Sequence, residues 1–593
     1  MDNVLEIIKL LFDWIIMWFS NIIVAIGTIL SNSIDITEFY TFIVRWIFPV
    51  LAVMVFFRCI LPLLHDKGYD TVWGFLVIPN SCRIPLKHWE NSIGRSKLSD
   101  IVINLPFVSR SHAVLTYDGE DWTITDLGSK GGVKVNGEKV IKSGMVEEGD
   151  TISLAGAEFL LLPAEAGYDT IPTQGYLKWF SRFGRNFDSQ KTLLMILVFQ
   201  ILGGIQVYFS MREEANLAIP FTILLFVFIE CFYFYIILRF SKKYLELELL
   251  VFFLCGLNLL VVATAVPDFL NKQLTAIILG IVAYFTIQVI VKDLTLANKL
   301  KYVLVAGALV LLLLNLIIGE SRFGAKNWIN LGFITFQPME FVKIAFVLAG
   351  TATLDKLLTT RNLTAFIGFS GSCIVALILM RDLGTAVIFF GAFLVIAFMR
   401  SGDLRTIAFI TSGAVLGAMA VVFLMPYIAA RFKAWRHVWE YADTIGYQQT
   451  RTMIASASGG LIGVGGGNGY LVNIAAADTD LVFGILCEEW GLIVALIAVL
   501  MIVFLAFLAV FLTKRCKSSF YAIAACGVAS IFLIQTALNV FGSVDLLPLT
   551  GITLPFVSNG GSSMVACWAL LAFIKAADER CRSDKEEIVK GNG

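Results

Sequence analysis

Titratable residues that could take part in catalysis gather where long hydrophobic stretches begin or end. Glu340 and Lys343 stand three residues apart at the start of one such stretch, and Asp443 precedes Gly446-Tyr447-Gln448 in a polar segment. A positioned carboxylate can accept the proton of an attacking hydroxyl, and cations can stabilise a leaving phosphate group. Each feature has a plainer interpretation as well, because Glu340 and Lys343 match an i, i+3 helix pair and most loop carboxylates are merely solvated.

The hydrophobic stretches are long enough to be membrane spans. The chain has 593 residues, of which 58% are hydrophobic and 15% are charged, whereas an ordinary soluble chain is about 25% charged. Runs such as 303–318 and 492–512 approach the roughly 20 apolar residues that a helix needs to cross the hydrocarbon core. The formal net charge is zero, so there is no bulk electrostatic argument for nucleic acid as a partner. Ten cysteines without a C-x-x-C pair argue against structural zinc and disulfides.

The predicted fold class is mainly α, a polytopic membrane protein of about 14 transmembrane helices with an inserted all-β domain. The predicted spans are 8–30, 42–64, 193–209, 218–238, 248–267, 273–292, 301–318, 340–356, 364–380, 384–399, 407–427, 481–512, 519–541 and 562–576. Hydropathy falls after the second span, where alternating residues and turn dipeptides indicate a small β domain. The predicted division is two spans in 1–64, the β domain in 65–166, a linker in 167–190, two spans in 191–245, a ten-helix core in 246–577 and a tail in 578–593.

The distribution of Lys and Arg sets the expected topology. If the β domain is cytoplasmic, the connections that an even number of crossings places inside all carry Lys or Arg, as the positive-inside rule requires. Both termini then also lie in the cytoplasm. Two basic segments, 322–326 and 431–436, fall outside and break the rule, so we interpret them as candidate anion-binding segments.

The β domain contains short motifs in a fixed order. They are Gly94-Arg95, Ser109-Arg110-Ser111-His112, Gly128-Ser129-Lys130-Gly131 and Val135-Asn136-Gly137. This order resembles the forkhead-associated (FHA) domain, a β-sandwich that recognises phosphothreonine. The resemblance implies that Arg95 and Ser109 contact the phosphate with Arg110 beside them, and that His112 braces the loop; the planar fork of an arginine suits a phosphate dianion. Gly131 stands where the family has Asn, so a scaffold sandwich that binds no phosphate is the alternative.

Four polar motifs follow in order along the second half of the chain. They are Gly324-Ala325-Lys326-Asn327-Trp328-Ile329-Asn330-Leu331-Gly332 with Gln337-Pro338-Met339-Glu340; Asp382-Leu383-Gly384-Thr385; Gly446-Tyr447-Gln448 through Ser458-Gly459-Gly460 to Thr479-Asp480 and Glu488-Glu489-Trp490-Gly491; and Leu554-Pro555-Phe556-Val557-Ser558-Asn559-Gly560-Gly561-Ser562-Ser563. They resemble the SEDS family (shape, elongation, division and sporulation; the RodA/FtsW/SpoVE type) over 247–575. Departures at Asn327, Met339, Arg381 and Asn559 indicate a divergent member.

The SEDS resemblance implies a peptidoglycan glycosyltransferase that polymerises lipid II into glycan strands at the outer face of the bacterial cytoplasmic membrane, for cell shape, division or sporulation. The family's essential Asp lies in the outward loop upstream of the Gly-Tyr-Gln motif, which implies Asp443 as the catalytic residue. The family's usual Asp-Pro pair is absent here, and a gapless count would instead reach His437. The implied substrate-binding residues are Glu340, Lys343, Arg431, Arg436, Gln448, Asp480, Glu488 and Ser562.

The resemblances also imply partners. These are lipid II, a class B penicillin-binding protein transpeptidase, the membrane, and a phosphothreonine-bearing protein that regulates the enzyme through the FHA domain. No cofactor is required by the sequence, and a divalent cation such as Mg²⁺ is the candidate. Two alternative functions stay open: a flippase for lipid-linked precursors, and a signalling adaptor with an inactive SEDS core. Asp443 favours the enzyme, and the missing Asp-Pro pair favours the adaptor.

Overall fold

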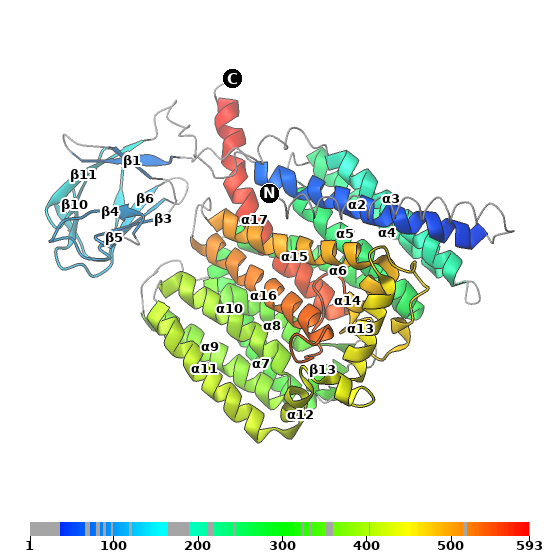
Figure 1. Cartoon of the computed structure of the whole chain (residues 1–593). Helices are drawn as coiled ribbons and strands as arrows, with labels where there is room; N and C mark the ends of the chain where they lie inside the picture. Colours follow the sequence, from blue (N-terminus) through cyan, green and yellow to red (C-terminus); the bar gives the residue numbers. More distant parts are fainter. Residues whose placement is uncertain are drawn as a thin grey trace, which may run out of the picture.

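The computed structural model of the chain describes residues 36–65, 72–78, 83–86, 90–96, 99–117, 121–163, 189–211, 217–240, 245–292, 294–322, 325–330, 332, 335–351, 360–401, 404–513 and 519–591. The predicted span 8–30 and residues 167–188 of the predicted linker lie outside the described residues. The described part comprises a β-sandwich and a helical bundle (Figure 1).

The β-sandwich consists of a six-stranded sheet, in the order β2-β1-β11-β10-β7-β8, and a five-stranded sheet, in the order β4-β3-β5-β6-β9. Its strands are β1 (Gly74–Val77), β2 (Arg83–Leu86), β3 (Glu90–Gly94), β4 (Ile101–Val102), β5 (Ala113–Tyr117), β6 (Trp122–Asp126), β7 (Val133–Val135), β8 (Glu138–Val140), β9 (Ser143–Val146), β10 (Thr151–Leu154) and β11 (Ala157–Pro163). Inward-facing residues of both sheets form one buried hydrophobic core, which includes Leu115, Ile124, Ile152 and Leu161. The alternating pattern of the sequence therefore predicted the β domain correctly.

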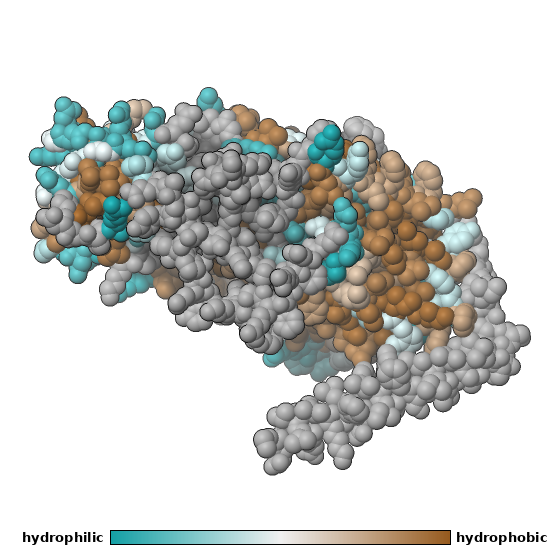
Figure 2. All heavy atoms as spheres, turned by 90° about the horizontal axis from the view of Figure 1, so that it is seen from above, coloured by the Kyte–Doolittle hydropathy of each residue, from teal (hydrophilic) through white to brown (hydrophobic). Residues whose placement is uncertain are grey.

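The bundle begins with three helices that precede the core matched by the SEDS motifs. They are α2 (Ile36–His65), α3 (Ser189–Ser210) and α4 (Ala218–Phe240). On α4 five large hydrophobic residues at spacings of three and four are exposed: Phe221, Leu224, Phe228, Phe232 and Tyr235. Such an exposed hydrophobic stripe suits contact with lipid. Figure 2 shows hydrophobic surface over much of the bundle, in contrast to the hydrophilic β-sandwich.

The bundle continues with α5 (Glu246–Ala265), which is buried along its whole apolar window and packs against α2 and α3, and with the helices that follow it. They are α6 (Leu270–Lys292), α7 (Leu294–Ile318), α8 (Pro338–Thr351), α9 (Thr360–Leu379), α10 (Leu383–Ser401), α11 (Leu404–Leu424), α12 (Pro426–Ala434), α13 (Tyr447–Gly459), α14 (Val482–Ile485), α15 (Leu492–Thr513), α16 (Ser519–Ser543) and α17 (Gly561–Gly591). Shorter elements are the 3₁₀ turns η3 (Pro267–Phe269), η4 (Val438–Tyr441) and η5 (Leu471–Asn473), the π-helix η6 (Leu486–Trp490), and the strands β12 (Glu320–Arg322), β13 (Ala325–Asn330) and β14 (Thr335–Phe336).

Among the described residues, nine helices are long and apolar enough to cross a membrane, or ten if the bent pair Ile407–Phe423 and Ile428–Ala434 counts as one span. Every predicted span except 8–30 overlaps one of the helices. The predicted multi-pass, mainly α membrane fold is therefore confirmed, and the count of about 14 stays a prediction.

One predicted span has a wrong start. The stretch 481–512 is not one helix, because Gly491 has a φ of 89° and separates the π-helix η6 from α15. Apolar residues flank Gly491 on both sides, at Trp490 and Leu492, so hydropathy alone did not reveal the break. Glu488 and Glu489 consequently lie in the π-helix before the span and not within it.

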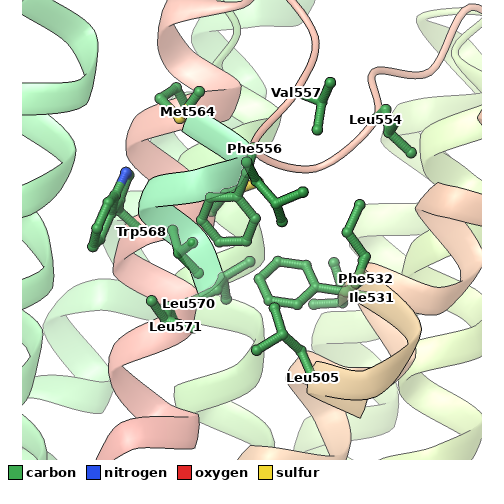
Figure 3. Packing of buried hydrophobic residues seen from close by; sticks show 14 of the residues in the cluster. Leu505, Ile531, Phe532, Leu554, Phe556, Val557, Met564, Trp568, Leu570 and Leu571 are labelled. Carbon is green, nitrogen blue, oxygen red and sulfur yellow. The ribbon is translucent and has the colours of Figure 1, made fainter. Parts of the chain in front are cut away.

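The segment 554–557 is anchored by hydrophobic packing beneath the polar end of the bundle. Phe556 packs edge-on against Phe532 of α16 and Trp568 of α17, with ring centroids 5.5 and 6.2 Å away (Figure 3). Leu554 and Val557 are buried in the same cluster. This packing fixes the backbone of the segment that continues into Ser558 and Asn559.

Candidate functional site

Polar side chains from several helices meet around the segment 549–553, which connects α16 to the anchored segment 554–557. The guanidinium of Arg431, on α12, donates to Leu549 O at 3.0 Å. The carboxylate of Asp480 lies against Gly551, since a Cβ added there would stand 3.2 Å from Asp480 Oδ2. Figure 1 places α12, α13, α14 and β13 together at one end of the bundle. The predicted residues Arg431 and Asp480 are thus brought to the same segment.

Asp480 is a partly buried carboxylate of this site. Burial raises its pKa to about 6, Asp478 adds to the rise, and a hydrogen bond from Thr479 and the charge of Arg431 oppose it. Asn539 holds the backbone by donating to Asp480 O and to Ile552 O, at 3.0 and 2.7 Å. Asp480 therefore changes charge near neutral pH, as a group in contact with a charged substrate can.

Glu340 and Lys343 form a buried ion pair at the start of α8. Lys343 Nζ lies 2.8 Å from Glu340 Oε1, and their side chains are 8% and 3% exposed for Glu340 and Lys343 respectively. Lys343 Nζ also donates to Gln535 Oε1 at 3.4 Å. The second oxygen of Glu340, Oε2, is buried and has no hydrogen-bond partner among the described residues. The i, i+3 pair is real, but an unsatisfied buried oxygen is costly, which marks the pair as more than a surface helix contact.

A chain of hydrogen bonds links this pair to the 549–553 segment. Gln535 Nε2 donates to Thr553 O and Thr553 Oγ1 at 3.0 and 3.1 Å. Thr553 Oγ1 in turn lies 2.9 Å from Ser563 Oγ at the start of α17. The neighbouring Ser562 Oγ accepts from the backbone N–H of Gln337 at 3.3 Å. Ser562 therefore ties α17 to the entrance of α8.

The site includes residues that the sequence reasoning missed. Gln535 and Asn539 connect its parts, and Asp478 accepts from Asn559 Nδ2 at 2.7 Å. Gln535 and Asn539 lie within the predicted span 519–541 and are both 1% exposed. Polar residues inside an apolar span are expensive and usually functional, so their position was a usable signal.

The loop between α12 and α13 carries the predicted catalytic residue. Asp443 is exposed on the turn after η4, and within the described residues no hydrogen bond of its carboxylate is recorded. Arg436 has a φ of 63° and is held by Asp545, whose Oδ1 accepts from its backbone N–H at 3.0 Å. Gln448 donates to Ala475 O at 2.8 Å and joins α13 to the succession of turns before Asp480. The structure thus places Asp443 and Arg436 on one short loop, and it does not bring Asp443 into contact with Asp480.

Glu488 has a defined contact of its own. Both of its carboxylate oxygens accept backbone N–H groups, from Tyr470 at 3.0 Å and from Leu471 at 2.8 Å. It therefore caps the 3₁₀ turn η5 and shares no recorded hydrogen bond with Lys343 or Arg431 in the described part of the chain. The described residues also contain no group of three or more His, Cys, Asp or Glu side chains that could hold a metal ion.

The β-sandwich presents a second candidate site at its loops. Arg95 is exposed, and its backbone N–H donates to Ser109 O at 2.9 Å. Ser109 Oγ accepts from Lys130 N at 3.1 Å, and Arg110 lies exposed beside it. The fully buried His112 ring contacts Ser109 N and Gly132 O, both at 3.1 Å. The three predicted residues Arg95, Ser109 and Arg110 therefore share one loop face, braced by His112.

Gly131 departs from the FHA pattern for a structural reason. A Cβ at this position would lie 2.1 Å from the Cβ of Ala155, so no side chain fits. Ala155 itself has a φ of 52° in the tight turn between β10 and β11. The absence of a side chain at Gly131 is thus matched by the close approach of the turn at Ala155.

The fold and the two sites define a multi-pass membrane protein with an inserted FHA domain. The profile of the FtsW/RodA/SpoVE family, described as cell cycle protein, matches residues 262–583, and the FHA domain profile matches residues 91–155. The chain therefore belongs to the FtsW/RodA/SpoVE family and carries an FHA domain, which confirms both predicted resemblances.

Individual relatives support this assignment. The chain is 31% identical over 297 residues to the probable peptidoglycan glycosyltransferase FtsW of Escherichia coli O6:H1, covering 48% of this chain and 72% of that protein. It is 29% identical over 331 residues to the peptidoglycan glycosyltransferase RodA of Mycobacterium leprae, covering 52% of this chain and 70% of that protein. A chain from a solved structure on the structural coordination of polymerization and crosslinking by a peptidoglycan synthase complex is similar, with 25% identity and a TM-score of 0.50, covering 58% of this chain and all of that one.

Proposed function

We propose that this protein is a glycosyltransferase that polymerises lipid II into peptidoglycan strands at the outer face of the cytoplasmic membrane, and that its FHA domain regulates it by recognising phosphothreonine. The observation that carries the proposal is the convergence of Arg431, Asp480 and the Glu340–Lys343 pair on the segment 549–553, within a chain of the FtsW/RodA/SpoVE family. Relatives named peptidoglycan glycosyltransferases support the reaction class.

In the proposed reaction the 4-hydroxyl oxygen of the acceptor sugar attacks the anomeric carbon of the donor. A new carbon–oxygen bond forms, and the bond from that carbon to the lipid diphosphate breaks, with the diphosphate keeping the electron pair. Asp443 takes the proton of the hydroxyl, since a positioned base contributes about 10²–10⁴ in rate. The exposed Arg431 and Arg436 stabilise the leaving diphosphate.

The other implied residues position substrate. We propose that Glu340 Oε2 accepts a hydrogen bond from a sugar hydroxyl, while Lys343 pairs with the other carboxylate oxygen of Glu340. Asp480 lines the proposed substrate site beside Gly551, and Gln448 lines it beside Ala475. Glu488 and Ser562 act through the backbone groups that they hold, and we assign them a positioning role.

The proposed topology follows the charge pattern. The FHA domain and both termini are cytoplasmic, and the loop from α12 to α14 is outside. The positions of α2 and α3 support it, because the chain enters the FHA domain from the end of α2 and leaves it into the start of α3. A class B penicillin-binding protein is the proposed crosslinking partner.

The decisive experiment is purified full-length protein incubated with lipid II, alone and with the partner transpeptidase, and scored for glycan strands on a gel. Strands made by wild type support the proposal. Movement of labelled lipid II across liposomes without strands would replace the enzyme with a flippase. Omitting Mg²⁺ from the same assay, and then titrating it back, tests whether polymerisation requires a divalent cation.

A further inference from the structure

The two helices that flank the FHA domain pack against each other in opposite directions. The hydroxyl of Tyr40, near the start of α2, donates to Leu202 O in the last half of α3 at 2.9 Å. Arg58, near the end of α2, donates to Thr192 Oγ1 at the start of α3 at 3.1 Å. The FHA domain is therefore joined to one end of this helix pair, at His65 and Ser189.

The other end of the helix pair contacts the glycine-rich loop 459–469. Gln206 of α3 is 1% exposed and donates to Thr41 Oγ1 of α2 at 2.9 Å and to Ser210 Oγ at 3.0 Å. A Cβ at Gly465 would lie 2.6 Å from Thr41 Cγ2, and a Cβ at Gly467 would lie 2.8 Å from Ser210 Cβ. Both glycines have positive φ values, of 102° and 82°. The loop backbone thus fits closely onto the ends of α2 and α3.

An aromatic contact fastens the π-helix to the same two helices. Trp490 is 1% exposed, and its ring lies 4.8 Å from Phe48 of α2 and 6.2 Å from Phe199 of α3. Aromatic contacts of this kind stabilise packing by more than the burial of their surface area alone. The π-helix η6 is therefore packed against the helix pair along with the loop.

The loop and the π-helix are also bonded to one another and to the site. Val464 N donates to Glu488 O at 2.8 Å, and Gly465 N donates to Glu489 O at 3.0 Å. The Glu488 carboxylate holds Tyr470 and Leu471, at the start of the segment that reaches Asp480. Gln448 meets this segment at Ala475. A continuous set of contacts thus runs from α2 and α3 to the proposed site.

We propose that α2 and α3 position the glycine-rich loop and through it the site, with Thr41 and Gln206 as positioning residues. The FHA domain, inserted in the sequence between the two helices at their other end, then acts on the site through this helix pair. This inference rests on the proposed function for its effect on rate, whereas the positioning of the loop can be measured without any activity.

The test is hydrogen–deuterium exchange on the full-length protein, read at the segment 459–470, which contains the bonded amides of Val464 and Gly465. Thr41→Val keeps the shape of the side chain and removes the acceptor of Gln206 Nε2. Loss of one neutral hydrogen bond changes a local opening equilibrium about fivefold. We expect about fivefold faster exchange at this segment and a fall of similar size in the turnover rate for lipid II. Thr41→Ser is expected to restore both.

Thr222→Val in α4 is the matched control. It removes a comparable hydrogen bond, from Thr222 Oγ1 to Asn271 Oδ1 at 3.0 Å, in a helix outside the α2–α3 pair. Unchanged exchange at 459–470 in a folded Thr41→Val protein overturns the proposal, as does an equal rise in Thr222→Val. Should Thr41→Val fail to fold, Gln206→Met removes the same bond from the other partner. If Thr41→Val exchanges faster than wild type but neither protein makes glycan strands, the proposed function is refuted and the positioning role remains supported.

Discussion

The two candidate sites are built over very different distances along the chain. In the FHA domain the residues that hold the binding face are near neighbours: Arg95 reaches Pro106, 11 residues away, and His112 reaches Gly132, 20 residues away. In the bundle, Lys343 reaches Gln535 across 192 residues, and Asn258 of α5 holds Ser558 O across 300. The FHA face thus depends on one small domain, and the membrane site depends on the packing of most of the bundle.

This difference decides how each site should respond to substitution. A change in the FHA face should stay local, because its supports come from the same loops. A change in the membrane site should affect both chemistry and folding, because the same side chains join distant helices. The following predictions test this contrast, from the largest expected effect to the smallest.

The largest effect is expected at the proposed base. Asp443→Asn keeps the size of an exposed side chain and removes the proton acceptor, so lipid II polymerisation should fall by about 10²–10⁴ while the protein still folds. Initial rates of strand synthesis measure it. Glu440→Gln, three residues earlier and also exposed, is the matched control. A wild-type rate in Asp443→Asn would move the base to Glu440, His437 or Asp480.

The buried ion pair gives the next largest effect, and it is an effect on stability. Lys343→Met leaves the Glu340 carboxylate buried without its cation, which should destabilise the bundle by about 3–5 kcal/mol. Unfolding of the purified protein in a denaturing detergent measures the loss. The double variant Glu340→Gln/Lys343→Met should recover much of the stability and none of the activity. Equal stability of the single and double variants would argue that the two side chains stabilise the bundle by packing alone and not by their charges.

Asp480 should give the bundle a pH-dependent stability. Its folded-state pKa of about 6 exceeds the ordinary 3.8, so the folded chain binds this proton roughly a hundredfold more tightly than the unfolded chain. The contribution is therefore fully present below about pH 4 and is lost as the pH rises through about 6. Thermal unfolding of wild type and Asp480→Asn between pH 4.5 and 7.5 measures it. The stability of the variant relative to wild type should increase as the pH rises. Parallel curves of stability against pH would show that Asp480 does not have the raised pKa.

A smaller and local effect is expected in the FHA domain. Arg95→Ala removes a charge-assisted contact worth about 1.5–3 kcal/mol, so binding of a phosphothreonine peptide should weaken at least about tenfold. Calorimetry with peptides selected from a phosphothreonine library on the full-length protein measures the affinity. Lys134→Ala, a change at an exposed residue of strand β7, is the control. Failure of wild type to bind any peptide in the library would favour the scaffold alternative for this domain.

The same contrast explains what the sequence could predict. Motif order between Gly94 and Gly137 was enough for the FHA domain, because its supports are local in sequence. For the bundle, hydropathy located the helices, motifs located Asp480 and Ser562, and the charge pattern located Arg431. The sequence could not reveal that Gln535 and Thr553 join Lys343 to Ser563, since these contacts arise only when distant helices pack. The break at Gly491 was missed because composition does not distinguish a π-helix from an α-helix, and apolar residues flank Gly491 on both sides.

The smallest expected effect is the one that joins the two regions. A phosphothreonine peptide bound at Arg95 should change the turnover rate of the membrane site about fivefold, the lower end of coupling between sites. The contacts of Thr41 and Gln206 with the glycine-rich loop supply the physical connection, which coupling requires. The measurement is the lipid II rate with and without the selected peptide, using its unphosphorylated form as the control. The response should be much smaller in Arg95→Ala, which binds the peptide more weakly, and in Thr41→Val, which binds it but has lost the hydrogen bond from Gln206. A peptide that binds wild type without altering its rate would show that the FHA domain recruits a partner and does not act on the site through α2 and α3.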